Sequence, residues 1–156
     1  MLHSENTCWM QAPAERIYRL AAPVEHWPDI LPHYRWVTLL HDEGDRRIVE
    51  MAARRGKFPV RWVAEEVCFP EEPRITFRHI EGVTRGMEVE WRFVPRDGGT
   101  QVTIAHDLDL AWPLVGPLVA RRIIAPQFIE AIAGQTLARI RDLAEAEERL
   151  APGASR

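Results

Sequence analysis

The feature that most constrains the fold is the segment Val83–Leu110, in which apolar and polar residues alternate on both sides of a tight turn. Every second residue is apolar from Met87 to Phe93, and the alternation resumes from Val102 to Leu110. This period is typical of strands with one buried face and one solvent face. Asp97-Gly98 between two such runs is a strong hairpin signal. The segment therefore predicts two antiparallel strands, and it places His106 on their otherwise aliphatic face.

The residues before this hairpin predict one strand, two short helices and four further strands. Pro13 favours a helix start because the missing N–H of proline would be unpaired there, and Pro23 ends that helix. Alternating apolar residues bounded by Gly and Pro define the strands. The expected elements are a strand over Asn6–Gln11, helices over Ala14–Ala21 and Val24–Leu31, and strands over Tyr34–Glu43, Arg46–Arg54, Val60–Phe69 and Arg74–Glu81.

After the hairpin, the pattern predicts one long amphipathic helix of about 20 residues from Pro126 onward. Such a helix buries its apolar stripe by lying against a sheet. The predicted fold is therefore α+β: a helix grip in which a curved seven-stranded antiparallel sheet surrounds the C-terminal helix, with two short helices after the first strand and a cavity inside. We expect a single domain over residues 1–150 and a disordered tail over residues 151–156.

The composition argues against several classes of function. The 156 residues carry a net charge of −3, without the basic patch that is typical of a nucleic-acid partner. No apolar run reaches the ~18 residues of a membrane span, and the first residues lack a secretion signal, so we expect a cytoplasmic protein. His26, His33 and His41 do not have the spacing of metal ligands. We expect no metal and no other cofactor.

Several short segments carry a resemblance to a known family. They are Gln11-Ala12-Pro13, the stretch from Glu25 to Leu31, Tyr34, Trp62-Val63, the stretch from Gly86 to Trp91, and Gly98-Gly99-Thr100. Together with the order of elements, they resemble the START-like helix-grip superfamily, and within it the polyketide cyclase/dehydrase and coenzyme Q-binding group. The resemblance covers roughly residues 5–147. Fold alone does not determine function in such a superfamily.

The resemblance implies a cavity that binds a hydrophobic small molecule, such as a lipid, a quinone or a polyketide-like chain. The expected ligand-binding residues are Trp27, Tyr34, Trp62, Ala64, Phe77, Val89, Trp91 and Ile104, and the catalytic candidates are Glu66, His79 and His106. In the related aromatase/cyclases, the position of Glu66 is similar to that of a catalytic arginine. An ionised glutamate cannot donate a hydrogen bond to an enolate as an arginine does, so this substitution favours binding over cyclisation.

Glu66 has two interpretations from the sequence alone. Its alternation with Trp62 and Ala64 points it inward, where it would act as a general base or a polar anchor. Alternatively, the strand turns it outward, or Arg54, Arg78 or a helix residue pairs with it, because an unpaired buried carboxylate is costly.

Three functions are therefore considered. The first is binding of a hydrophobic small molecule, the second is polyketide aromatase/cyclase-dehydratase activity on a poly-ketone chain, and the third is a protein-interaction module of the same superfamily. The segment Trp112–Ile124 combines apolar residues with two arginines. It is either a cap of the cavity or a contact surface for a carrier protein or a membrane.

Overall fold

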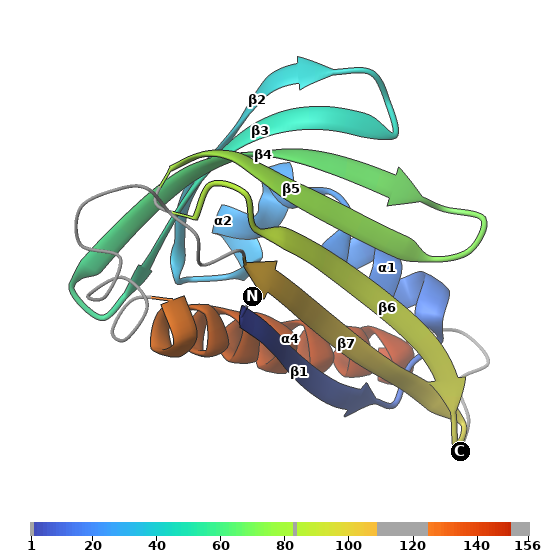
Figure 1. The fold of residues 1–156 in the computed structure, drawn as a ribbon. Helices are drawn as coiled ribbons and strands as arrows, with labels where there is room; N and C mark the ends of the chain where they lie inside the picture. The colour runs from blue at the N-terminus through green and yellow to red at the C-terminus, as the bar shows by residue number, and fades with distance from the viewer. Residues whose placement is uncertain (1, 83, 109–124, 151–156) are drawn as a thin grey trace.

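A computed structural model describes residues 2–82, 84–108 and 125–150, and its seven strands form one curved antiparallel sheet (Figure 1). The strand order is β1-β7-β6-β5-β4-β3-β2, so all strands after β1 follow one another as hairpins. The elements are β1 (Leu2–Met10), α1 (Ala14–Ala21), η1 (Val24–His26), α2 (Trp27–Ile30), β2 (Tyr34–Asp42), β3 (Arg46–Arg55), β4 (Phe58–Phe69), β5 (Arg74–Gly82), β6 (Glu88–Arg96), β7 (Gly99–Leu108) and α4 (Ala125–Leu150). The predicted fold class is confirmed.

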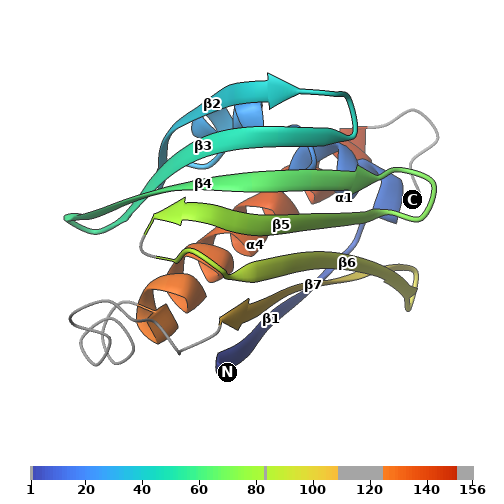
Figure 2. The ribbon, with the colours of Figure 1, turned by 45° about the horizontal axis from the view of Figure 1, so that its top comes forward.

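The helix α4 lies along the concave side of the sheet (Figures 1 and 2). Its apolar stripe is buried, with Ile129, Ile132, Ala133, Leu137, Ile140 and Ala144 all in the core. Burial of such side chains supplies most of the stability of a helix, because an isolated helix is only marginally stable in water. The amphipathic pattern therefore correctly predicted which face of α4 meets the sheet.

The segment α1-η1-α2 connects β1 to β2, which are the two opposite edges of the sheet. Three elements differ from the prediction, and one of them is β4, which begins at Phe58 instead of Val60. The strand β1 begins at Leu2 and pairs with β7 from Leu108 to Thr100, whereas the sequence suggested a start at Asn6. The expected second helix divides into η1 and α2 at Trp27, because Pro28 is tolerated only in the first turn of a helix.

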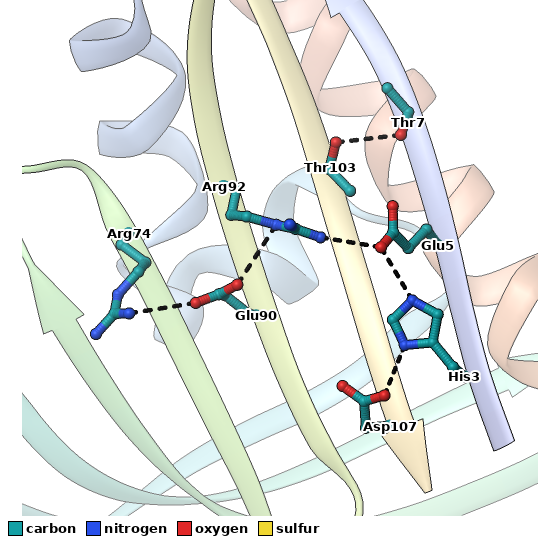
Figure 3. A network of polar contacts seen from close by, with 8 residues as sticks. All are labelled: His3, Glu5, Thr7, Arg74, Glu90, Arg92, Thr103 and Asp107. Atoms are coloured by element: carbon teal, nitrogen blue, oxygen red, sulfur yellow. Dashed lines mark hydrogen bonds and ion pairs between the residues drawn. The ribbon is translucent and has the colours of Figure 1, made fainter. Parts of the chain in front are cut away.

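The convex face of the sheet carries a network of charged side chains (Figure 3). Arg92 binds Glu5 at 3.2 Å, and His3 bridges Glu5 and Asp107 at 2.9 and 2.6 Å. The hydrogen bonds to these two carboxylates raise the pKa of His3. This solvent-exposed outer face is the counterpart of the apolar inner face that the alternation predicts.

Two predictions fall on parts of the chain that lie outside the described residues. They are the disordered tail over residues 151–156 and the contact segment Trp112–Ile124. Across the described ranges, no helix has both the length and the apolar character needed to cross a membrane.

Candidate functional site

A cavity of about 80 Å³ lies between the sheet and the first half of α4. Its walls come from α2, from the concave face of the sheet and from the α4 residues Ile129, Ile132, Ala133 and Thr136. Seven of the eight residues expected to bind a ligand line it, namely Trp27, Tyr34, Trp62, Phe77, Val89, Trp91 and Ile104. The eighth, Ala64, is fully buried but is not part of the lining. Met51, Val60 and Met87 complete the apolar wall, and sequence reasoning did not single them out as site residues.

The aromatic lining is held in place by edge-to-face and stacked contacts. The rings of Trp27 and Tyr34 lie 4.9 Å apart at 69°, and the rings of Tyr34 and Trp62 lie 6.1 Å apart at 74°. The indole N–H of Trp27 donates to the Ala21 carbonyl at 3.1 Å. Offset and edge-to-face arrangements are the favoured geometries of aromatic pairs. The cavity therefore has a rigid aromatic wall where α2 meets the sheet.

His79, on β5, lies inside this wall as a neutral side chain. Its ring stacks on Trp62 at 5.4 Å and 9°, and its Nδ1 lies 2.7 Å from the hydroxyl oxygen of Thr84. Burial lowers the pKa of His79 to about 3, with a smaller contribution from His106. The turn that follows β5 supplies Thr84, so the local backbone keeps one side of this imidazole occupied.

His106, on β7, also lines the cavity, but its hydrogen bonding is incomplete. It lies across from Val89 on β6, and only 9% of its surface is exposed. Its Nδ1 is buried without a hydrogen-bond partner among the described residues. Burial lowers the pKa of His106 to about 4, so the ring is neutral near pH 7. A buried polar atom without a partner is uncommon and is often completed by water or a ligand.

A third polar group joins the loop before β2 to α4. The Thr136 hydroxyl donates to the Ile132 carbonyl at 2.7 Å, and His33 Nε2 lies 2.8 Å from the same hydroxyl oxygen. Since the hydroxyl proton is already used, His33 donates from Nε2. Burial lowers the pKa of His33 to about 4 and raises the pKa of the adjacent Tyr34. The sequence offers His33 only as a possible metal ligand, and no local pattern links it to Thr136.

Glu66 is inward-facing and fully buried, but it does not line the cavity with the two histidines. Its Oε1 accepts hydrogen bonds from Nη2 and Nε of Arg47, at 2.6 and 3.0 Å. Arg47 also donates to Glu25 at 2.8 Å and to the Ala22 carbonyl at 3.0 Å. The idea that Arg54 or Arg78 pairs with Glu66 is therefore wrong, because the partner is its cross-strand neighbour Arg47.

The ion pair of Arg47 and Glu66 belongs to a network that connects the sheet to the short helices through Glu25 and Ala22. Burial raises the pKa of Glu66 to about 7 against the opposing effect of the Arg47 guanidinium. Glu66 Oε2 has no hydrogen-bond partner in the described part of the chain. The predicted cluster of Glu66, His79 and His106 is thus divided: the two histidines share the cavity, and Glu66 belongs to a separate buried network.

The cavity is an uncharged and mostly apolar binding pocket. No Asp, Glu, Lys or Arg is found among the described residues that line it. Its polar atoms are those of two neutral imidazoles, a phenol, two threonine hydroxyls and three indoles. Within residues 2–82, 84–108 and 125–150, no group of His, Cys, Asp or Glu side chains is arranged to hold a metal ion. An ionised ligand would lose its hydration here without gaining a counter-ion.

Comparison with other sequences gives a consistent result. The profile of a family described as polyketide cyclase / dehydrase and lipid transport matches residues 10–132. The bifunctional cyclase/dehydratase of the actinorhodin polyketide synthase from Streptomyces coelicolor is 31% identical over 104 residues, which cover 65% of this chain and 33% of that protein. The granaticin counterpart from Streptomyces violaceoruber is 30% identical over 111 residues, covering 69% and 34%. The chain thus spans about one third of the length of these curated relatives.

Solved structures show the same architecture. A protein from Thermus thermophilus superposes with a TM-score of 0.79 at 26% identity, over 94% of this chain and 99% of that one. The Zhui aromatase/cyclase from a Streptomyces species has a TM-score of 0.82 at 22% identity, over 99% of each chain. At 22% identity, the similarity to the Zhui aromatase/cyclase supports a shared fold alone.

Proposed function

Because the chain belongs to the polyketide cyclase/dehydrase and lipid transport family, we propose that it binds an uncharged hydrophobic small molecule in the cavity under α4. The observation that carries this proposal is Nδ1 of His106, which belongs to a mostly apolar cavity wall and has no hydrogen-bond partner within residues 2–82, 84–108 and 125–150. A ligand with one polar group completes this hydrogen bond and covers the aromatic side chains. The pKa values of about 3 and 4 for His79 and His106 keep the site uncharged at neutral pH.

The size of the cavity sets a condition on the ligand. Its volume of about 80 Å³ is far below the roughly 300–1,000 Å³ of typical pockets for drug-sized molecules. A lipid, a quinone or a polyketide-like chain therefore requires the wall to move. Among the α4 side chains that the structure describes (residues 129–150), polar contacts with the rest of the fold lie from Thr136 onward, where Arg139 donates to Ile30 and Glu148 pairs with Arg16. We propose that the first turns of α4, around Ile129 and Ile132, yield to larger ligands.

A matched set of one-ring probes tests this proposal. Phenol, toluene and benzoate have similar shapes, but only phenol is both neutral and able to donate a hydrogen bond near pH 7. Binding is measured by equilibrium dialysis at neutral pH. We expect phenol to bind about two- to tenfold more tightly than toluene, the range of one net hydrogen bond, and benzoate to bind far more weakly.

The control variant is His106→Leu, which introduces an apolar side chain of similar size and removes both ring nitrogens. We expect it to bind phenol no more tightly than toluene, because the phenol hydroxyl then loses its hydration without gaining an acceptor. Tight binding of benzoate, or a phenol preference that survives in His106→Leu, would show that the assigned chemistry of the cavity is wrong. If none of the three probes binds, ligand binding itself is refuted.

The second candidate function is cyclisation and dehydration of a poly-ketone chain. The location of His79 and His106 in the cavity supports it, as does family membership. In this hypothesis a neutral imidazole takes a proton from a methylene between two carbonyls, and the carbanion attacks a third carbonyl of the same chain. The alkoxide takes the proton back, and loss of one water completes the double bond. The first step needs an unprotonated imidazole and the later steps need its protonated form as the acid. The lowered histidine pKa values supply the first form at neutral pH, but they also make the imidazoles weak bases, which is why this function ranks second.

Turnover of a synthetic poly-ketone by the wild type, His106→Gln, His79→Gln and Glu66→Gln separates the three catalytic candidates. A role of Glu66 as base requires it to leave Arg47, so we expect Glu66→Gln to retain turnover and His106→Gln to lose it. Equal loss in all three variants would place Glu66 in the chemistry.

A further proposal is that Trp112–Ile124 contacts a carrier protein or a membrane. Deleting this segment and measuring delivery of a carrier-bound substrate tests it.

A further inference from the structure

The hairpin between β3 and β4 extends beyond the rest of the sheet (Figure 2). The last partner of β2 on β3 is Ala53, and the first partner of β5 on β4 is Trp62. Between these residues, β3 and β4 pair with each other and with no third strand in the described structure. A two-residue turn closes the hairpin, and the φ of +58° at Gly56 is a value that glycine adopts without strain. We call residues Arg54–Phe58 the hairpin tip.

The hairpin tip combines three cations with one exposed aromatic ring. Arg54, Arg55 and Lys57 are all exposed, and Phe58 is 73% exposed, the largest value of any aromatic side chain in the described residues. There is no carboxylate between Glu50 and Glu65, in a chain whose net charge is −3. Arg54 and Lys57 therefore place positive charge at one projecting point of a chain whose net charge is negative.

The hairpin tip is also close in sequence to the lining of the cavity. Val60 lies two residues after Phe58 on the same strand, and both Val60 and Trp62 line the cavity. A surface bound by the hairpin tip would therefore lie close to the wall that encloses a hydrophobic ligand.

From these features we propose that the hairpin tip docks on the surface of an anionic lipid bilayer, with Phe58 inserted among the lipid headgroups and the cations Arg54 and Lys57 above them. Cations attract anionic lipids, and an exposed aromatic ring gains from the interfacial region of a bilayer. An acidic protein fits less well. A stable protein interface buries about 800 Å² on each partner, roughly 20–30 residues, and a five-residue projection offers much less. A bilayer accepts single side chains and needs no complementary shape.

Vesicle flotation with the full chain tests this proposal without any ligand, so its outcome is independent of binding in the cavity. We use vesicles of phosphatidylcholine alone and vesicles with about 30% phosphatidylglycerol, at low salt where electrostatic attraction is least screened. We expect binding to the mixed vesicles only. The variant Arg54→Gln/Lys57→Gln should lower the partition coefficient by roughly fivefold for each cation removed. Phe58→Ala should lower it by about tenfold.

Two control variants carry the same kinds of change at other exposed positions. Val94→Ala removes an exposed apolar side chain near the β6–β7 turn, and Arg74→Gln/Arg92→Gln removes two cations from the convex face. Both should bind mixed vesicles with at least half the wild-type partition coefficient if the hairpin tip is the site.

Three results overturn the proposal. They are equal binding to both kinds of vesicle, an effect of the control variants as large as that of the tip variants, and full binding by Phe58→Ala. If Phe58→Ala binds mixed vesicles fully and soluble polyglutamate competes with them, the hairpin tip is an electrostatic site for acidic proteins rather than a lipid-docking element.

Discussion

Removal of Arg47 should strongly destabilise the protein, because it leaves Glu66 as an uncompensated buried carboxylate. Glu66 has no exposed surface. Arg47 donates two hydrogen bonds to Glu66, and it also donates one to Glu25 and one to the Ala22 carbonyl. Breaking a buried ion pair on one side costs about 3–5 kcal/mol. In Arg47→Met the free energy of unfolding should therefore fall by about 4 kcal/mol, a large fraction of the roughly 5–15 kcal/mol of a typical domain.

The assay is urea unfolding at neutral pH, followed by circular dichroism. With a slope of about 2 kcal/mol per molar urea, the midpoint of Arg47→Met should fall by roughly 2 M. Glu66→Gln keeps an acceptor for Arg47 and removes only the charge, so we expect a smaller loss of about 1–2 kcal/mol. The double variant Arg47→Met/Glu66→Met should be more stable than Arg47→Met alone, because no charge remains buried.

The pH dependence provides a second check. Burial raises the pKa of Glu66 to about 7 even with Arg47 present, and loss of Arg47 removes the main opposing influence. A carboxyl whose folded pKa lies above its unfolded value stabilises the fold below the unfolded pKa, and this stability is lost as pH rises through the folded pKa. Arg47→Met should therefore be less destabilised at about pH 5 than at about pH 8. A loss below about 1 kcal/mol, additive effects, or the opposite pH trend would refute this account of Glu66.

Further predictions concern the cavity histidines and two glycines. The folded pKa values of about 3 for His79 and about 4 for His106 lie below the unfolded value. The stability that these histidines contribute above about pH 6.5 should therefore be lost as the pH falls through their folded pKa values. In an acid titration, His106→Leu should lose less stability than the wild type. Gly99→Ala should cost more than about 1 kcal/mol in thermal unfolding, because the new Cβ would clash with the carbonyl oxygen of Met10 on β1. Gly134→Ala, a helix position with open space, should instead raise stability by about 0.5–1 kcal/mol; the reverse order of the two glycine variants would contradict the packing described here.

Much of the fold could be predicted because its signals are local. The alternation on both sides of Asp97-Gly98 depends on neighbouring residues only, and so does the stripe of α4. The same alternation correctly placed His106 on the inner face, where it lines the cavity. A hairpin meander followed by a single amphipathic helix leaves few arrangements open, so the order of elements was sufficient for the helix grip.

The surroundings of Glu66 depend on strand register, which the analysis of the sequence did not resolve. The expected strands Arg46–Arg54 and Val60–Phe69 leave residues 55–59 between them unpaired, but Gly56-Lys57 is a two-residue hairpin turn, and that turn pairs Arg47 with Glu66. Turn length determines register in a hairpin, so the signal was present in the sequence. The contact of His33 with Thr136 had no such signal, because it joins a loop to a helix 103 positions later.

The most direct test of the proposed function is nuclear magnetic resonance of the histidine side chains during a titration with phenol. If an uncharged ligand completes the hydrogen bonding of His106, its side-chain nitrogen resonances should shift with the same affinity that dialysis gives. Those of the exposed His3 and His41 should stay unchanged. Saturation with phenol that leaves the His106 resonances in place, or that shifts only resonances of the outer surface, would contradict the binding site described here.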